Sequence, residues 1–322
     1  MNPKLRIALA AAGLALPLLA GAQAEAWPAR PIRIIAPTSP GSSTDYLARA
    51  LGQYVAGATK QAVVVENKPG GNAVIGVEAA RTAPPDGYTW FIGSVSTHSA
   101  NPALFAKLPY DPARDFVEVG MFSVFPYFAV VRKDSALQTV AQLLEAAKAK
   151  PGKLTCGYAT AASRVPCELL KIRAHVDILT VPYKAAPAVL NDVAGGVIDF
   201  TMMDAMSASI AIKGGLLRPI GITAAARATA YPDVHTVAEA LPGFVYEGWA
   251  GLSAPAGTPV AVLERMNQYL REALAQPAMR REIEASGAVV KATTLAEQAS
   301  WTAGDRKQWR EWVKLANIPP VE

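Results

Sequence analysis

The sequence predicts an α/β protein of two lobes, each a mainly parallel sheet flanked by helices. Short apolar strands alternate with amphipathic helices along most of the 322 residues, which is typical of parallel sheets. Two apolar stretches without helical periodicity, Val119 to Val131 and Tyr246 to Pro255, interrupt this alternation. We expect them to be the extended crossings of a hinge beside a cleft, the first divided into two segments at Pro126.

The chain begins with a segment typical of an export signal. Lys4 and Arg6 precede a long apolar run, and small residues then flank Ala24 and Ala26, as a signal peptidase requires. We therefore expect residues 1–26 to be a signal peptide that is cleaved near one of these alanines. The run is short for a membrane span, although an uncleaved anchor is an alternative.

The rest of the chain is long enough for two domains. We predict one lobe from residues 27–126 and 246–322, and the other from residues 127–245. Hydrophobic residues make up 51% of the chain and charged residues 18%, which is typical of a globular protein. The formal charge is +5, but basic residues occur singly or in short pairs, so we expect no nucleic-acid partner.

The most informative segment is IRIIAPTSPGSSTD, residues 32–45, which predicts a buried strand, a loop and the start of a helix. Gly41 permits a tight turn, and Ser42, Ser43 or Thr44 can cap the helix. Apolar residues then recur at helical spacing. The free N–H groups of such a junction bind anions, although many strand-to-helix turns hold no ligand.

Two more strands are expected in the first lobe. AVVVE, residues 62–66, precedes a glycine-rich turn and a helix through Val74 and Ala80, and YTWFIG, residues 88–93, precedes a polar loop at 94–98. Because parallel strands point the same way, the loops that follow them should meet at one edge of the sheet.

The second lobe is expected to repeat the alternation of helix and strand. Its predicted order is helix 140–150, strand 154–159, helix 163–174, strand 178–183, helix 186–194, strand 198–203, helix 207–213 and strand 217–223. Three helices then close the chain, at 260–275, 278–286 and 295–315.

The two cysteines, Cys156 and Cys167, lie at the end of a predicted strand and in the next helix. An oxidising compartment permits a disulfide if that helix folds back over its strand. Two small buried thiols are the alternative.

No catalytic motif is found in the chain. Its histidines, His98, His175 and His235, have no zinc-ligand spacing, and no nucleophile elbow, phosphate loop or dinucleotide motif occurs. We therefore expect no enzyme, metal or cofactor. A secreted serine hydrolase that uses His98 with Ser94 or Ser96 is the alternative, because triads assemble in space.

Nine segments, which together span Trp27 to about Pro319, resemble Bug-type periplasmic receptors of tripartite tricarboxylate transporters. They are APTSPGSSTDYLARAL, VVVENKPGGNAVIGVEAA, PPDGYTWFIGS, STHSANPALF, LPYDPARDF, KPGKLTCG, VPYKAAPAVLNDVAGGVIDF, YPDVHTVAEA and GLSAPAGTP. The resemblance implies a type II periplasmic binding protein, which we expect to be a monomer. Such a receptor closes around a small organic carboxylate and delivers it to an inner-membrane permease. A ligand sensor that docks on a membrane signalling protein would share this fold.

The resemblance also implies a ligand site on loops of both lobes. In the first lobe it comprises Thr38, Ser39, Gly41, Ser42, Ser43, Ser94, Ser96, Thr97 and His98. In the second lobe it comprises Tyr158, Thr160, Ser163, Arg164, Lys184 and Asp204. The first loop departs from the family at Ser42, where a second glycine is usual, and Arg164 either pairs with a second ligand carboxylate or lies on the helix surface. We expect Asp45 to interact with its own helix rather than with an anionic ligand.

Overall fold

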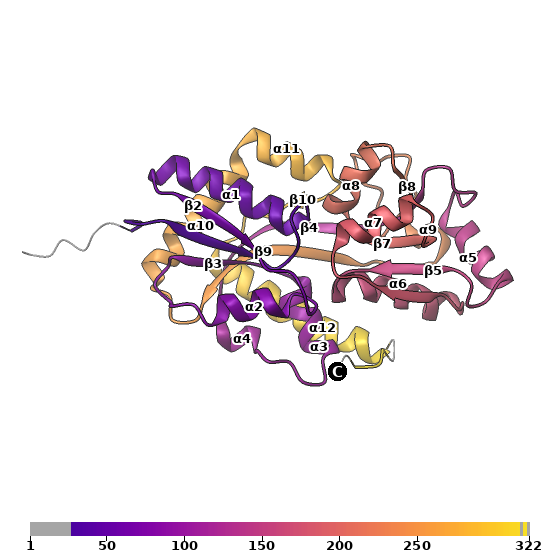
Figure 1. Cartoon of the computed structure of the whole chain (residues 1–322), viewed down its shortest axis with the longest axis horizontal. Coiled ribbons are helices and arrows are strands. Elements are labelled where there is room, and N and C mark those ends of the chain that lie inside the picture. The colour runs from indigo at the N-terminus through magenta and orange to yellow at the C-terminus, as the bar shows by residue number, and fades with distance from the viewer. Residues whose placement is uncertain (1–26, 316–317, 321–322) are drawn as a thin grey trace, which may run out of the picture.

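Two α/β lobes lie side by side in the computed structural model (Figure 1), which describes residues 27–315 and 318–320. The predicted signal peptide, residues 1–26, lies outside the described residues. Among the described residues, no helix combines the length and the apolar character needed to cross a membrane.

The first lobe contains a sheet in the order β2-β1-β3-β9-β4, with β10 also paired to β4. Strands β1, β2 and β3 are parallel, whereas β9 is antiparallel to both β3 and β4. The bounds of these strands are Ile32–Ala36 (β1), Val63–Asn67 (β2), Thr89–Ser94 (β3), Phe116–Arg132 (β4), Glu247–Pro255 (β9) and Val289–Val290 (β10).

The second lobe continues from the same β4, in the order β4-β7-β5-β6, with β8 also paired to β4. Strands β5, β6 and β7 are parallel, and β4 runs antiparallel to β7 and β8. Their bounds are Thr155–Tyr158 (β5), Leu179–Pro182 (β6), Phe200–Asp204 (β7) and Leu217–Ile222 (β8). The predicted two-lobed α/β fold is therefore confirmed.

Helices flank both sheets (Figure 1). Those of the first lobe are α1 (Ser43–Thr59), α2 (Val74–Arg81), α3 (Asn101–Leu104), α4 (Pro112–Asp115), α10 (Val260–Ala275), α11 (Pro277–Ala285) and α12 (Leu295–Leu315). Those of the second lobe are α5 (Val140–Ala149), α6 (Ala161–Ala174), α7 (Ala186–Ala194), α8 (Ala205–Lys213) and α9 (Val237–Ala240). The sequence did not predict α3, α4, α9, β10 or the π-helical turn η1 (Ser96–Ala100), all of which are short.

The first crossing between the lobes is one continuous strand, so the expected division into two segments at Pro126 is wrong. Strand β4 pairs with β9 as far as Pro126, opposite Glu247, and pairs with β7 from Tyr127, opposite Asp204. Proline cannot donate a hydrogen bond to a sheet. It is tolerated here because it lies at the last residue pair before β4 passes from one set of neighbours to the other.

The second crossing reaches β9 through Tyr246 and is joined to the first by Thr223. The Thr223 hydroxyl donates to the Tyr246 carbonyl and accepts from the amide of Tyr127 at 2.7 Å. The backbone of Thr223 adds bonds to the same two residues, at 2.9 Å and 3.0 Å. One fully buried side chain therefore connects both strands of the hinge.

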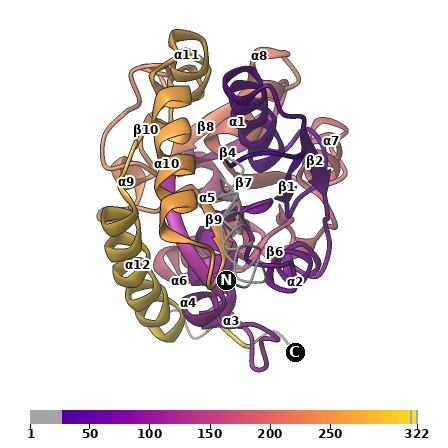
Figure 2. The ribbon, with the colours of Figure 1, turned by 90° about the vertical axis from the view of Figure 1, so that its left-hand side faces the viewer.

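Helix α12 covers the side of the hinge formed by Tyr246. Its Trp309 and Trp312 rings lie 5.8 Å and 5.7 Å from the ring of Tyr246. The Tyr246 hydroxyl donates at 2.7 Å to the Ala162 carbonyl of α6, in the second lobe. Figure 2 shows α12 along one flank of the molecule. The C-terminal helix is thus packed against the connection between the lobes.

We expect Thr223→Val to lower the free energy of unfolding by about 1–3 kcal/mol, because it leaves the buried amide of Tyr127 and carbonyl of Tyr246 without this partner. Urea unfolding of a protein that begins at residue 27 would measure the loss. Thr82→Val is the matched control, since the exposed Thr82 hydroxyl bonds only within its own helix turn. Equal effects of the two substitutions would contradict the role given to Thr223.

Candidate functional site

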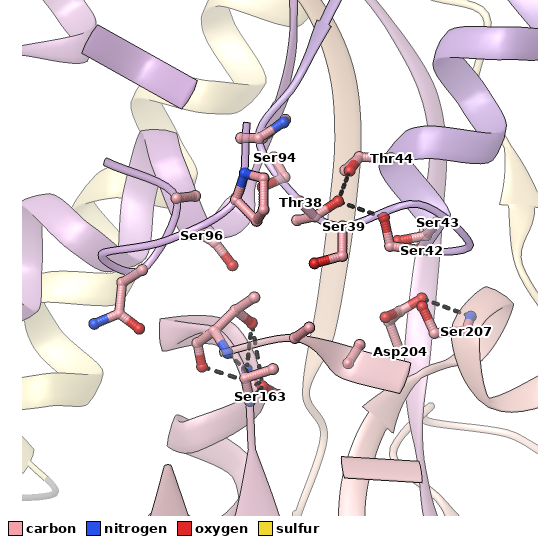
Figure 3. A pocket seen from close by; sticks show the side chains of 18 of the residues that line it. Thr38, Ser39, Ser42, Ser43, Thr44, Ser94, Ser96, Ser163, Asp204 and Ser207 are labelled. Carbon is pink, nitrogen blue, oxygen red and sulfur yellow. Dashed lines mark hydrogen bonds between the residues drawn. The ribbon is translucent and has the colours of Figure 1, made fainter. Parts of the chain in front are cut away.

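A cavity of about 330 Å³ lies between the two lobes. Its walls are the loops that follow β1, β2 and β3 in the first lobe and β5, β6 and β7 in the second. Phe125, Tyr127, Met203 and Ala250, from the strands near the hinge, give it an apolar side. Figure 3 shows hydroxyls of the first lobe facing Ser163, Asp204 and Ser207 across the cavity.

The first wall contains the N-terminus of α1. Gly41 has a φ of +79°, a conformation that glycine adopts without strain. Ser42 caps the helix by accepting from the amide of Asp45 at 3.4 Å, and Thr38 bonds the hydroxyls of both Ser42 and Thr44.

Two amides at this helix end remain available. Those of Ser43 and Thr44, the first two of α1, make no hydrogen bond with the described residues, as expected for the start of a helix. Both residues line the cavity, so their amides can bind a ligand.

The opposite wall contains the N-termini of α6 and α7. Thr160 and Ser163 form a capping box, in which the Thr160 hydroxyl accepts from the Ser163 amide at 3.2 Å and the Ser163 hydroxyl accepts from the Thr160 amide at 3.0 Å. Helix α7 starts at Ala186 and has no side-chain cap. Positive ends of helices therefore face the cavity from both lobes.

Charged side chains are few around the cavity. Among the described residues that line it, only Lys184 is basic and only Asp204 is acidic. Lys184 is exposed, whereas Asp204 caps α8 by accepting from the amide of Ser207 at 3.0 Å. The cavity is thus suited to an anion chiefly through helix ends and hydroxyls, not through a cluster of cations.

Asp45 does not line the cavity but supports the loop between β1 and α1. Its carboxylate accepts from the Gly41 amide, from Asn67 and from Arg49, each at 2.9 Å. Burial alone would raise the pKa of Asp45, but these bonds outweigh it and hold the pKa below its usual value. Asp45 therefore fixes the loop that presents the α1 amides, as expected of an acid that interacts with its own helix.

Ten of the predicted site residues line the cavity. They are Thr38, Ser39, Ser42, Ser43, Ser94, Ser96, Thr160, Ser163, Lys184 and Asp204. The other five, Gly41, Thr97, His98, Tyr158 and Arg164, are not among the residues that line it.

His98 is directed into the protein because the chain turns inward at η1. Its ring is fully buried beside Phe116 and Trp249, with centroids at 5.6 Å and 5.9 Å, and its Nε2 lies 3.3 Å from the Ser253 hydroxyl. Burial lowers the pKa of His98 to about 3. Thr97 is buried too, and its hydroxyl lies 2.8 Å from Nδ1 of His98. A hydrolase triad with Ser94 or Ser96 does not form here.

Arg164 and Tyr158 lie beside each other, away from the lining. The Arg164 guanidinium is 5.9 Å from the ring of Tyr158 and 3.8 Å from the carboxylate of Glu168 on its own helix. The Arg164 side chain is only 16% exposed, so it lies neither in the cavity lining nor on an open helix surface. Cys156 and Cys167 are bonded to each other and connect β5 with α6.

Sequence reasoning missed the wall that follows β2. Pro69 to Ala73 line the cavity, and Gly70 and Gly71 have positive φ values of +119° and +55°. The loop after β2 should lie at the same edge of the sheet as the loops after β1 and β3, because the three strands are parallel. The glycine-rich sequence KPGGNA could therefore have identified this loop as part of the site. Thr44, Tyr183 and Ser207 were also missed, although Ser207 stands three residues after a capping aspartate, where its amide meets the cap.

The model of the tripartite tricarboxylate transporter family receptor matches residues 47–318. The chain belongs to this family. Among the described residues, no group of three or more His, Cys, Asp or Glu side chains could hold a metal ion. The family assignment made from the sequence is therefore confirmed. Because the family and its structural neighbours are solute-binding receptors, not enzymes, the hydrolase alternative is discarded.

Several relatives span nearly the whole receptor. Protein BugT of Bordetella pertussis is 32% identical over 307 residues, which are 94% of this chain and 93% of BugT. A protein of R. palustris solved with adipate is 28% identical, with a TM-score of 0.88 over 92% of this chain and all of that one. MatC from Rhodopseudomonas palustris, solved with bound malate, is 28% identical, with a TM-score of 0.84 over 89% of this chain and 99% of MatC.

A cluster of buried polar side chains in the first lobe includes His98, Glu118 and Ser253. The Ser253 hydroxyl donates to Glu118 at 3.1 Å, and Nε2 of His98 lies 3.7 Å from the same carboxylate. Burial raises the pKa of Glu118 to about 7, against the opposing effect of the hydrogen bond from Ser253. The Glu118 carboxyl therefore keeps its proton in the folded state at pH values where the unfolded chain has lost it.

We expect the free energy of unfolding of the Glu118→Gln variant to increase, relative to that of the native protein, as the pH rises from about 4.5 to 7. Over this range the folded native state binds the Glu118 proton more strongly than the unfolded state, so the native protein loses stability as the pH increases. Urea unfolding at several pH values would measure this, with the exposed Glu145→Gln variant as the control. A difference that stays constant with pH would contradict the expectation.

Proposed function

We propose that this protein is a periplasmic receptor that captures a small organic carboxylate between its lobes and delivers it to the inner-membrane permease of a tripartite tricarboxylate transporter. The proposal rests on the observation that the N-termini of α1, α6 and α7 lie at the same cavity. Unpaired amides and positive dipole ends on both lobes are complementary to a carboxylate. The adipate and malate bound by the two related structures support this ligand class.

Such a site can bind tightly without an arginine. Micromolar affinity requires about 8 kcal/mol, and a hydrogen bond to a charged group contributes about 1.5–3 kcal/mol. The free amides of Ser43 and Thr44 and the hydroxyls of Ser94 and Ser96, together with apolar contact near Phe125, offer enough partners. We take these groups, with the other predicted residues that line the cavity, as the ligand site.

Hinge motion would couple capture to delivery. Ligand groups that touch both walls favour the closed arrangement of the lobes, because they bind it more tightly than the open one. The hinge consists of β4 and the chain around Tyr246, and each lobe could rotate as a unit about them. We propose that the protein acts as a monomer whose closed lobes together form the face that the permease recognises.

Binding by the mature chain tests capture directly. We expect isothermal titration with mono-, di- and tricarboxylates, aromatic ones included, to find a ligand of micromolar or better affinity that also raises the melting temperature. Ser43→Trp should weaken this affinity by at least about tenfold, because the indole fills the space in front of the α1 amides. Ser300→Trp, on an exposed turn of α12, is the matched control. If no carboxylate binds, the proposed ligand class is wrong.

Delivery has its own test in the bacterium that produces the receptor. Cells without the receptor should lose the uptake of the radiolabelled carboxylate that binds in vitro, and the native gene should restore it whereas Ser43→Trp should not. Normal uptake in the deletion strain would contradict the transport role and leave ligand capture standing.

A further inference from the structure

Asp204 is an unexpected residue in a cavity that otherwise favours anions. It is the last residue of β7, lies opposite Tyr127 in the register with β4, and lines the cavity beside the hinge. Figure 3 shows it on the wall of the second lobe, facing Ser42 and Ser43. A carboxylate of the ligand placed next to Asp204 would be repelled, and the repulsion is strong where water is excluded.

The role of Asp204 as a helix cap leaves acceptor capacity unused. One oxygen, Oδ1, accepts from the Ser207 amide at 3.0 Å, but a carboxylate has two oxygens and about four acceptor positions. Burial raises the pKa of Asp204, against the opposing effect of the Ser207 amide and of the nearby Ser207 and Ser43 hydroxyls. A further donor would stabilise the ionised carboxylate in this position.

Ser207 adds a buried hydroxyl beside the same carboxylate. The residue is 3% exposed and lines the cavity, and its hydroxyl lies near the Asp204 carboxylate without a hydrogen bond of good geometry to any described residue. Buried hydroxyls in native proteins nearly always have a partner. The carboxylate of Asp204 and the hydroxyl of Ser207 therefore lie on the same part of the wall with capacity for a polar ligand group.

We propose that Asp204 and Ser207 bind a hydrogen-bond donor on the ligand, a hydroxyl or an ammonium group, so that the receptor selects hydroxy- or amino-substituted carboxylates over unsubstituted ones. This inference rests on the proposed carboxylate-binding function. The ligand's carboxylates meet the amides at the ends of α1, α6 and α7, and its donor group meets Asp204. An unsubstituted ligand would bury Asp204 without a new partner, which disfavours its binding.

Matched ligand sets test the selection. Titrations of the mature chain at pH 7.5 would compare succinate with L-malate and L-aspartate, glutarate with 2-hydroxyglutarate and L-glutamate, and phenylacetate with mandelate and phenylglycine. We expect the hydroxy or the amino member of at least one set to bind about tenfold or more tightly than its unsubstituted partner. A preference for the hydroxy member identifies the donor as a hydroxyl, and a preference for the amino member identifies an ammonium group.

Asp204→Asn isolates the charge, because asparagine also caps helices and keeps the shape of the side chain. We expect this variant to reduce the preference to less than about threefold while its melting temperature without ligand stays close to that of the native protein. Asp111→Asn is the control, since Asp111 also caps a helix, α4, but lies outside the cavity lining and should leave the preference unchanged. Ser207→Ala should lower the affinity for the substituted ligand more than for the unsubstituted one.

Two results would overturn the inference while the proposed function stands. One is tight binding of unsubstituted carboxylates without any preference for substituted ones, and the other is a preference that survives in Asp204→Asn. Binding of unsubstituted ligands that depends on the acid at position 204 would instead show Asp204 donating a proton to a ligand carboxylate. If no carboxylate of any kind binds, the proposed function fails as well.

Discussion

The arrangement of this receptor depends on one strand shared by two sheets. Because β4 pairs with β9 over its first part and with β7 and β8 over its last part, the two sheets are joined side by side. The parallel strands of each lobe therefore end at the same gap. The helix that follows such a strand starts at that end, so helix N-termini from both lobes meet at the cavity. The anion-binding character of the site follows from this topology.

Serine and threonine residues have two roles at the cavity. Ser42, Thr160 and Ser163 take part in capping α1 and α6, which fixes the start of each helix, and they also line the cavity. The caps engage the third amide of each helix, and the first two amides of α1 remain available to a ligand. The Ser42 hydroxyl also joins Thr38 to the helix cap. The ligand-binding surface is therefore built largely from groups that also stabilise the fold.

The hinge combines a tightly packed side with a polar cavity. Thr223 joins the two crossings by hydrogen bonds, and Tyr246 packs against Trp309 and Trp312 of the C-terminal helix. On the cavity side, small hydroxyl residues and the apolar surface near Phe125 leave space between the lobes. A ligand that touches both walls then determines how often the closed arrangement is occupied.

The sequence by itself determined the alternation of strands and helices, the place of the two crossings and ten of the residues that line the cavity, because hydrophobic periodicity and capping residues act locally and parallel strands share an edge. It also carried the family resemblance. The sequence could not determine side-chain direction within a loop, so Thr97 and His98 were placed in the site although the turn at η1 directs them into the core. Nor could it predict that β4 continues through Pro126, because only the change of strand partners makes a proline acceptable there. Tertiary structure decided these points, since each depends on neighbours far away in the chain.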